Sequence, residues 1–215
     1  MSGRLIAWAS LIGVLSALNY AARFAGGKPP RDALYHWSAA VEGLVQYGII
    51  LAIVLWIARA DGELLALRRP VSWKLAVGLA GATLVGIFAL NALLEPLLHA
   101  GHEQGLTPKG WDPSRTAPFA ANFVVIALVA PVVEELTFRG LGFGLLERYG
   151  QTAVILLVGL AFALWHGLVG AFPILFAFGA ALAYLRARTE SVYPAMLLHG
   201  TFNALSLAAA VTIAT

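Results

Sequence analysis

The chain has 215 residues, of which 60% are hydrophobic and only 12% are charged, and its formal net charge is +3. A soluble globular protein carries about 25% charged residues, so this composition excludes an ordinary soluble domain and predicts a membrane protein. The basic residues stand singly or in pairs between apolar runs, which argues against nucleic acid as a partner. Cysteine is absent, which excludes disulfides, thiolate metal ligands and a cysteine nucleophile.

Seven apolar runs follow one another along the chain, and a helix needs about 20 such residues to cross a bilayer. The first run, residues 5–24, is expected to be retained as a span and not cleaved as a signal peptide. The others cover residues 36–58, 73–98, 118–146, 151–170, 172–186 and 192–213. None shows the alternation of a barrel strand. The sequence therefore predicts an all-α, polytopic transmembrane helical bundle of about seven spans, with six to eight as the range because the sixth run is short.

Lysine and arginine are unevenly shared between the two sets of breaks. Of the 14 such residues, eight lie on the side of the N-terminus, five lie on the other side, and Arg139 falls within a run. The eight are Arg4, Arg59, Arg68, Arg69, Lys74, Arg148, Arg186 and Arg188, and the five are Arg23, Lys28, Arg31, Lys109 and Arg115. Because cytoplasmic loops carry the excess of positive charge, we expect a cytoplasmic N-terminus. The membrane is expected to be a bacterial inner membrane.

Small residues recur four apart in two of the runs, and such rows let helix backbones approach closely in a membrane. The rows are Gly78, Ala82 and Gly86 in the third run, and Gly159, Ala163 and Gly167 in the fifth. Both are expected to be packing faces.

The longest break, residues 99–118, contains four residues of metal-ligand type: His99, His102, Glu103 and Asp112. Their spacing fits no common metal site. We therefore expect an ordinary solvated loop there.

Ionisable residues within a span cost roughly 2.5–3.5 kcal/mol each on insertion scales, so they tend to mark a functional or a paired structural position. The fourth run contains Glu134, Glu135 and Arg139. Glu135 and Arg139 are four apart, which places them on one helix face and predicts an ion pair. Glu134 is rotated by about 100° from Glu135. It is therefore free to face the bundle interior, where a carboxylate can act as a general base.

Two further polar clusters lie in later runs, Phe162 with His166 and His199 with Asn203. His199 and Asn203 are four apart, so they offer an imidazole and an amide to one volume, and such donors stabilise a developing oxyanion. A purely structural role, as a helix-to-helix hydrogen bond for Asn203 or a satisfied buried histidine for His166, stays open. From the helix ends, Glu134, His166 and His199 lie at depths of about 18, 22 and 10 Å, so the three side chains can meet near the middle of the bilayer.

The three clusters, in this order and on separate spans, resemble the motifs of the CAAX-protease and bacteriocin-processing family, whose members are intramembrane glutamic proteases. The motifs are Glu-Glu-x-x-x-Arg, Phe-x-x-x-His and His-x-x-x-Asn, and all three are complete here. The resemblance begins near residue 118. It implies a catalytic core in residues 118–215, integrated in one bundle with N-terminal helices of unassigned role in residues 1–117.

The resemblance also implies a role for each motif residue. Glu134 would activate a water that His166 also holds, and His199 with Asn203 would stabilise the tetrahedral oxyanion. The supporting residues would be Glu135, Arg139 and Phe162.

The resemblance favours a reaction without a cofactor, since no His-Glu-x-x-His motif is present. A zinc-dependent form of the same protease, with the metal held by Glu134, His166 and His199, is the alternative.

The expected partners are the lipid bilayer and a membrane-associated protein or peptide substrate, processed at its C-terminus or in a CAAX-like manner. A membrane-anchored or amphipathic substrate is preferred to a prenylated one. Two other classes of function remain open: an ion- or proton-coupled transporter that uses the buried polar groups as a relay, and a non-catalytic immunity or adaptor protein. The oligomeric state does not follow from the sequence.

Overall fold

The computed structural model describes residues 3–26, 30, 32–99, 103 and 110–213, and in this part of the chain all regular structure is helical, as the composition predicts. Of the residues singled out above, Lys28, Arg31, His102 and Lys109 lie outside it. The α-helices are α1 (Gly3–Ala25), α2 (Trp37–Ala58), α3 (Trp73–Leu98), α4 (Thr116–Val124), α5 (Ala130–Glu135), α6 (Phe143–Leu146), α7 (Gln151–Trp165), α8 (Phe172–Thr189) and α9 (Tyr193–Ile213).

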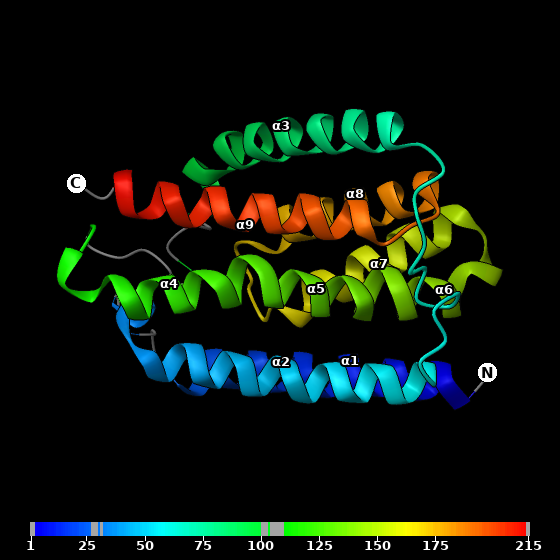
Figure 1. The fold of residues 1–215 in the computed structure, drawn as a ribbon, viewed down its shortest axis with the longest axis horizontal. Helices are drawn as coiled ribbons and strands as arrows, with labels where there is room; N and C mark the ends of the chain where they lie inside the picture. Colours follow the sequence, from blue (N-terminus) through cyan, green and yellow to red (C-terminus); the bar gives the residue numbers. More distant parts are fainter. Residues whose placement is uncertain (1–2, 27–29, 31, 100–102, 104–109, 214–215) are drawn as a thin grey trace.

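Five helical stretches in the described residues are long and apolar enough to cross a membrane. They are α1, α2, α3, α9 and a continuous rod, Pro113–Tyr149, that contains α4, α5 and α6. The shorter apolar helix α7 and its neighbour α8 form an antiparallel hairpin. With these two, the helices of the described residues agree with a bundle of about seven spans, and the start of α1 and the end of α9 lie at opposite ends of the bundle (Figure 1).

The rod lies between two groups of helices (Figure 1). Helices α1 and α2 lie on one side of it, where α2 contacts α4 and α5 and α1 contacts α6 and α7. Helix α9 lies on the other side against α5, and α3 covers α9 and α8 from outside. Side chains from α5, α7 and α9 therefore face a shared interior.

The rod stays helical past Pro131, where the sequence suggests that an overlong span would tilt, protrude or kink. Two π-helical segments, Val125–Val129 and Leu136–Gly142, lie on either side of this proline. A wider turn accommodates the missing N–H and the ring of a proline. At 1.5 Å per residue the 37 residues span about 55 Å, well beyond a core of about 30 Å. The rod therefore has to tilt within the membrane or protrude from it.

The small-residue row in α7 packs as predicted. A side-chain carbon at Gly159 would lie 2.9 Å from the backbone nitrogen of Ala180, and one at Gly179 would lie 3.0 Å from the carbonyl oxygen of Gly159. Helices α7 and α8 thus touch backbone to backbone.

The same prediction is wrong for α3. A side chain at Gly78 or Gly86 would meet nothing within 4 Å in the described structure. The buried residues of α3 are Ala76 and Ile87 instead. Spacing alone identifies a face that could pack, whereas the neighbouring helices decide which face does.

Helix α7 ends five residues before the predicted boundary at 170. Gly167 adopts φ = +63°, a left-handed conformation that glycine tolerates best and that ends a helix. A side chain there would also lie 2.8 Å from the carbonyl carbon of Asn19 in α1. Helix α8 then begins at Phe172, with Pro173 in its first turn, and runs to Thr189, three residues past its predicted end. His166 consequently sits at the C-cap of α7, in a turn and not within a helix.

Candidate active site

Glu134 projects from α5 into the interior and is 4% exposed. Its Oε1 accepts a hydrogen bond of 2.8 Å from the hydroxyl of Tyr47 on α2. Its Oε2 is buried and has no hydrogen-bond partner in the described part of the chain. One carboxylate oxygen is thus fixed, and the other is available to a further group.

Two histidines face that oxygen. Nε2 of His166, at the end of α7, and Nε2 of His199, on α9, each lie 3.9 Å from Oε2 of Glu134. His199 is almost fully buried, whereas the side chain of His166 is 22% exposed. The structure therefore brings together three residues that the sequence separates by up to 65 positions.

The other ring nitrogen of each histidine, Nδ1, has a hydrogen-bond partner of its own. Nδ1 of His199 lies 2.8 Å from Oε1 of Glu135, and Nδ1 of His166 lies 2.7 Å from the carbonyl oxygen of Phe162. Ionised carboxylates and carbonyls only accept hydrogen bonds, so both Nδ1 atoms carry the proton. In the neutral rings, Nε2 is then an acceptor that faces Glu134.

The predicted ion pair between Glu135 and Arg139 is present and completely buried, with Nη1 of Arg139 3.0 Å from Oε1 of Glu135. Nη2 of Arg139 donates to the carbonyl oxygen of Gly179 at 2.7 Å. The guanidinium also lies 4.5 Å from the ring centre of Phe162, within cation–π distance. Arg139 thus offsets the charge of the carboxylate that holds His199.

Phe162 supports both histidines. Its ring centre lies 4.5 Å from that of His166 and 5.6 Å from that of His199. Phe138 packs edge-on against Phe162 at 5.4 Å. These contacts restrict rotation of the two imidazoles.

Asn203 lies one turn beyond His199 on α9, and its amide donates to the carbonyl oxygen of Ile126 at 2.9 Å. Ile126 belongs to the first π-helical segment of the rod. This is the helix-to-helix hydrogen bond that the sequence leaves open as a structural role. A side-chain amide has a second N–H, so a role in binding an oxyanion stays a prediction.

Tyr47 is the residue of this cluster that motif spacing misses. It lies 87 positions before Glu134, outside all three motifs. The available signal is a tyrosine hydroxyl, flanked by Gln46 and Gly48, in the middle of an otherwise apolar run. A buried tyrosine hydroxyl usually has a hydrogen-bond partner, but the sequence does not say which.

Glu103 departs from the prediction of a solvated loop. Its side chain is only 8% exposed and pairs with Arg23. Its two oxygens accept from the backbone N–H groups of Val169 and Ala171, at 2.9 and 2.8 Å. His102 lies outside the described residues, so the expectation that this loop binds no metal stays a prediction.

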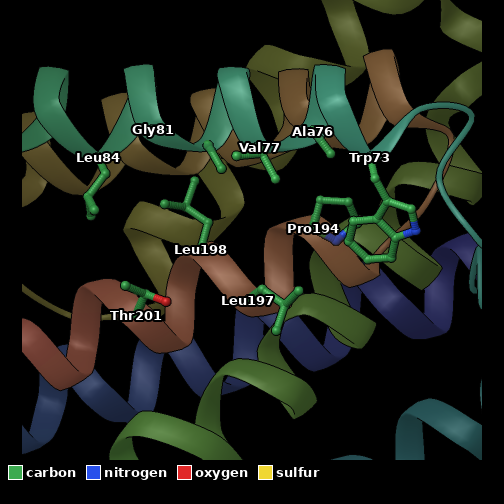
Figure 2. Close-up of a pocket in the computed structure, with 10 residues that line it drawn as sticks. Trp73, Ala76, Val77, Gly81, Leu84, Pro194, Leu197, Leu198 and Thr201 are labelled. Atoms are coloured by element: carbon green, nitrogen blue, oxygen red, sulfur yellow. The ribbon is translucent and has the colours of Figure 1, made fainter.

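A groove of about 250 Å³ opens between α3 and α9 (Figure 2). Thr201 supplies the only side-chain hydroxyl in a lining that is otherwise apolar apart from the indole N–H of Trp73. The lining is Trp73, Ala76, Val77, Ala80, Gly81, Leu84, Pro194, Leu197, Leu198 and Thr201. At 100° per residue, the α9 residues of this lining point roughly opposite to His199. The groove is therefore separate from the cluster around Glu134.

Residues 116–205 match the family model described as Type II CAAX prenyl endopeptidase Rce1-like. No curated protein and no solved structure matches the chain. The matched segment contains all three motifs, and it excludes α1, α2 and α3. Segment 116–205 is thus similar to the family of type II CAAX prenyl endopeptidases, in a chain whose described part contains five helical stretches long and apolar enough to cross a membrane.

Proposed function

We propose that this protein hydrolyses a peptide bond of a membrane-associated protein with a water activated by Glu134. The observation that carries the proposal is the buried, unpartnered Oε2 of Glu134, which lies 3.9 Å from Nε2 of both His166 and His199 in the described structure. A water with ordinary bonds of about 2.8 Å to two atoms at this separation makes an angle of about 90° between them. A water can therefore bridge Oε2 of Glu134 and an imidazole, and we infer that one water contacts all three side chains.

The hydrogen-bond partners of the Nδ1 atoms of His166 and His199 limit the positions of the protons on the two rings. With both Nδ1 atoms protonated, neutral histidines present two acceptors beside the carboxylate, which makes three acceptors around one water. A water has only two protons to donate. We infer that one imidazole is protonated at Nε2 and donates a hydrogen bond. His199 is proposed for this role because its Nδ1 is the one held by a carboxylate, 2.8 Å from Oε1 of Glu135.

The reaction then proceeds in two steps. Oε2 of Glu134 takes a proton from the water as its oxygen attacks the carbonyl carbon, and the carbonyl π electrons move to its oxygen. The Nε2–H of His199 and the second amide N–H of Asn203 stabilise that oxyanion. Glu134 next returns the proton to the leaving nitrogen, and the carbon–nitrogen bond breaks to give an acid and an amine.

The zinc-dependent alternative uses the same three side chains. Histidines whose Nδ1 is hydrogen-bonded to a carboxylate or a carbonyl are typical zinc ligands, so the donor set is chemically suitable. Zinc bonds of about 2.0–2.1 Å in a tetrahedron place ligand atoms about 3.3 Å apart, which is shorter than the 3.9 Å separations from Glu134. This geometry favours the metal-free reaction.

The substrate is proposed to be a protein or peptide held at the membrane, because the site lies within a bundle of membrane-spanning helices. Because the matched family is described as a CAAX prenyl endopeptidase, a prenylated CAAX peptide is one of the substrates to test. The bias of basic residues supports an orientation with the N-terminal face in the cytoplasm.

The test is cleavage of a panel of membrane-anchored peptides, prenylated and unprenylated, by the purified protein in lipid nanodiscs. Replacing the base, Glu134→Gln, should lower kcat by roughly 10²–10⁴-fold, while Glu42→Gln, at an exposed glutamate of α2, should leave it unchanged. A strong chelator should have no effect on the wild type. Full turnover by Glu134→Gln would contradict the assignment, and loss of activity with the chelator would favour zinc. Proton flux in sealed vesicles without new peptide ends would indicate a transporter.

A further inference from the structure

The turn that follows His166 has backbone groups that its own helix cannot satisfy. Helix α7 has 15 residues and is about 22 Å long, which is shorter than the hydrocarbon core of a bilayer. Backbone N–H groups that a helix end leaves unpaired need other partners, such as a side chain. The N–H groups of Val169 and Ala171 point at the carboxylate of Glu103, one at each oxygen.

The carboxylate is itself held in place. Arg23, near the end of α1, pairs with Oε1 of Glu103 through its guanidinium and also reaches the backbone carbonyl of Glu103 at 3.5 Å. A largely buried carboxylate is stable only when it is paired and hydrogen-bonded, and here a cation and two N–H donors meet that need. Charge-assisted hydrogen bonds of this kind are among the strong ones in proteins.

The same turn is packed from two other sides. The side-chain amide of Asn19 donates to the carbonyl oxygen of Trp165, immediately before His166. Gly170 leaves no room for a side chain, which would come within 2.8 Å of the carbonyl oxygen of Leu98 and 3.2 Å of Oε2 of Glu103. The backbone around His166 is therefore fixed by residues of α1, α3 and Glu103, all of which lie outside the family match.

We propose that Glu103 is a positioning residue of the active site: it holds the turn 167–171 so that Nε2 of His166 faces Glu134, and Arg23 holds Glu103. This inference rests on the proposed function for its kinetic consequence. Glu103 does not touch the reacting atoms, so its loss should displace His166 without abolishing substrate binding. A displacement of about 1 Å in a catalytic group can cost roughly 10²-fold in rate.

The first measurement is kinetic and uses Glu103→Gln in the full-length protein in nanodiscs. This variant removes the charge but keeps the shape of the side chain. We expect kcat to fall about 10- to 100-fold while KM changes less than about twofold. The control Glu42→Gln should keep wild-type values. A kcat within about twofold of wild type in folded Glu103→Gln protein would overturn the proposal.

The second measurement is amide hydrogen exchange in the same variant, because a residue that stabilised the fold in general would raise exchange in many helices. We expect faster exchange at Val169 and Ala171, with exchange around His199 on α9 unchanged. Uniformly faster exchange, or no change at the turn, would also overturn the proposal. Exchange is measured without substrate, so it tests whether Glu103 holds the turn even if the wild type cleaves no peptide of the panel. A wild type that cleaves no peptide would count against the proposed function alone.

A third variant covers the case in which Glu103→Gln does not fold. Arg23→Met removes the cation and leaves the carboxylate in contact with both N–H groups. We expect the same direction of change with a smaller size, a fall in kcat of about 3- to 10-fold with local acceleration of exchange at Val169 and Ala171. Wild-type kinetics together with wild-type exchange in this variant would show that Arg23 does not hold the turn through Glu103.

Discussion

At the scale of single residues, the two oxygens of Glu134 have different surroundings. Oε1 accepts from Tyr47, whereas Oε2 faces the two histidines. A carboxyl group rotates freely unless one of its oxygens is held. The hydroxyl of Tyr47 therefore selects the orientation in which the other oxygen can act as a base.

Replacing Tyr47 with phenylalanine tests this role. The change removes one hydroxyl and keeps the ring, so we expect kcat to fall about 10-fold with KM nearly unchanged. We also expect a loss of about 1–3 kcal/mol in stability, because Oε1 of Glu134 becomes a buried acceptor without a donor. Peptide cleavage and thermal melting of the purified protein measure the two effects. The control is Tyr184→Phe, at a partly exposed tyrosine whose hydroxyl accepts from Arg188, and a Tyr47→Phe variant that behaves like this control would contradict the role.

The residue-level predictions that hold are those that depend on local spacing. Glu135 and Arg139 pair because four positions make one helical turn, whatever surrounds the helix. Tyr47 and Glu103 could not be predicted in the same way. Their partners lie 87 and at least 66 positions away, and only the packing of α2 and α1 against the rod and α7 decides those contacts.

At the scale of elements, the rod shows how a long helix can carry polar contacts. The carbonyl oxygen of Ile126, in the first π-helical segment, accepts from Asn203, and that of Thr137, in the second, accepts from Trp8 at 2.9 Å. A side chain at Gly200 would lie 2.7 Å from the carbonyl oxygen of Ala127, so α9 approaches the first segment very closely. The sequence predicts the length of this span but not its π-helical turns, since these depend on the donors that neighbouring helices present.

The start of the rod is tied to the segment between α1 and α2 by an ion cluster. Arg115 contacts both Asp112 and Asp32, at 2.6 and 2.9 Å. The hydroxyl and backbone N–H of Ser114, together with Arg115, lower the pKa of Asp112 to about 2. Arg115 and His36 lower the pKa of Asp32. Both carboxylates are therefore more acidic in the folded protein than the usual value of about 3.9.

A depressed pKa in the folded state predicts a specific dependence of stability on pH. The contribution of Asp112 should be fully present above its unfolded pKa of about 3.9 and should disappear as the pH falls through about 2. Asp112→Asn keeps a side-chain oxygen that can accept from Ser114, and it removes the charge together with the oxygen that accepts from Arg115. We expect the melting temperature of this variant to lie below that of the wild type at pH 7, with the difference shrinking between about pH 4 and pH 2. A difference that stays constant over this range would contradict the role of the charge.

At the scale of the whole molecule, the part of the chain outside the family match supplies contacts on two sides of the site. Helix α2 provides Tyr47 to Glu134, and α1 provides Asn19 and Arg23 to the turn that carries His166. The sequence predicts one integrated bundle but assigns no role to residues 1–117. Motif reasoning cannot assign one, because these helices act through single long-range hydrogen bonds and not through a spaced pattern.

The orientation of the bundle is the remaining whole-molecule prediction. The break between α2 and α3 and the start of α4 lie at opposite ends of the bundle (Figure 1). Glu63 belongs to that break and Ala117 to the start of α4, and both are exposed. Because the chain contains no cysteine, Glu63→Cys and Ala117→Cys each introduce a single thiol. With the N-terminal face in the cytoplasm, a membrane-impermeant maleimide should label Ala117→Cys in spheroplasts. It should label Glu63→Cys only after the membrane is permeabilised. The reverse pattern would place the N-terminus outside and would turn the end of the bundle that carries Asp112 and Arg115 toward the cytoplasm.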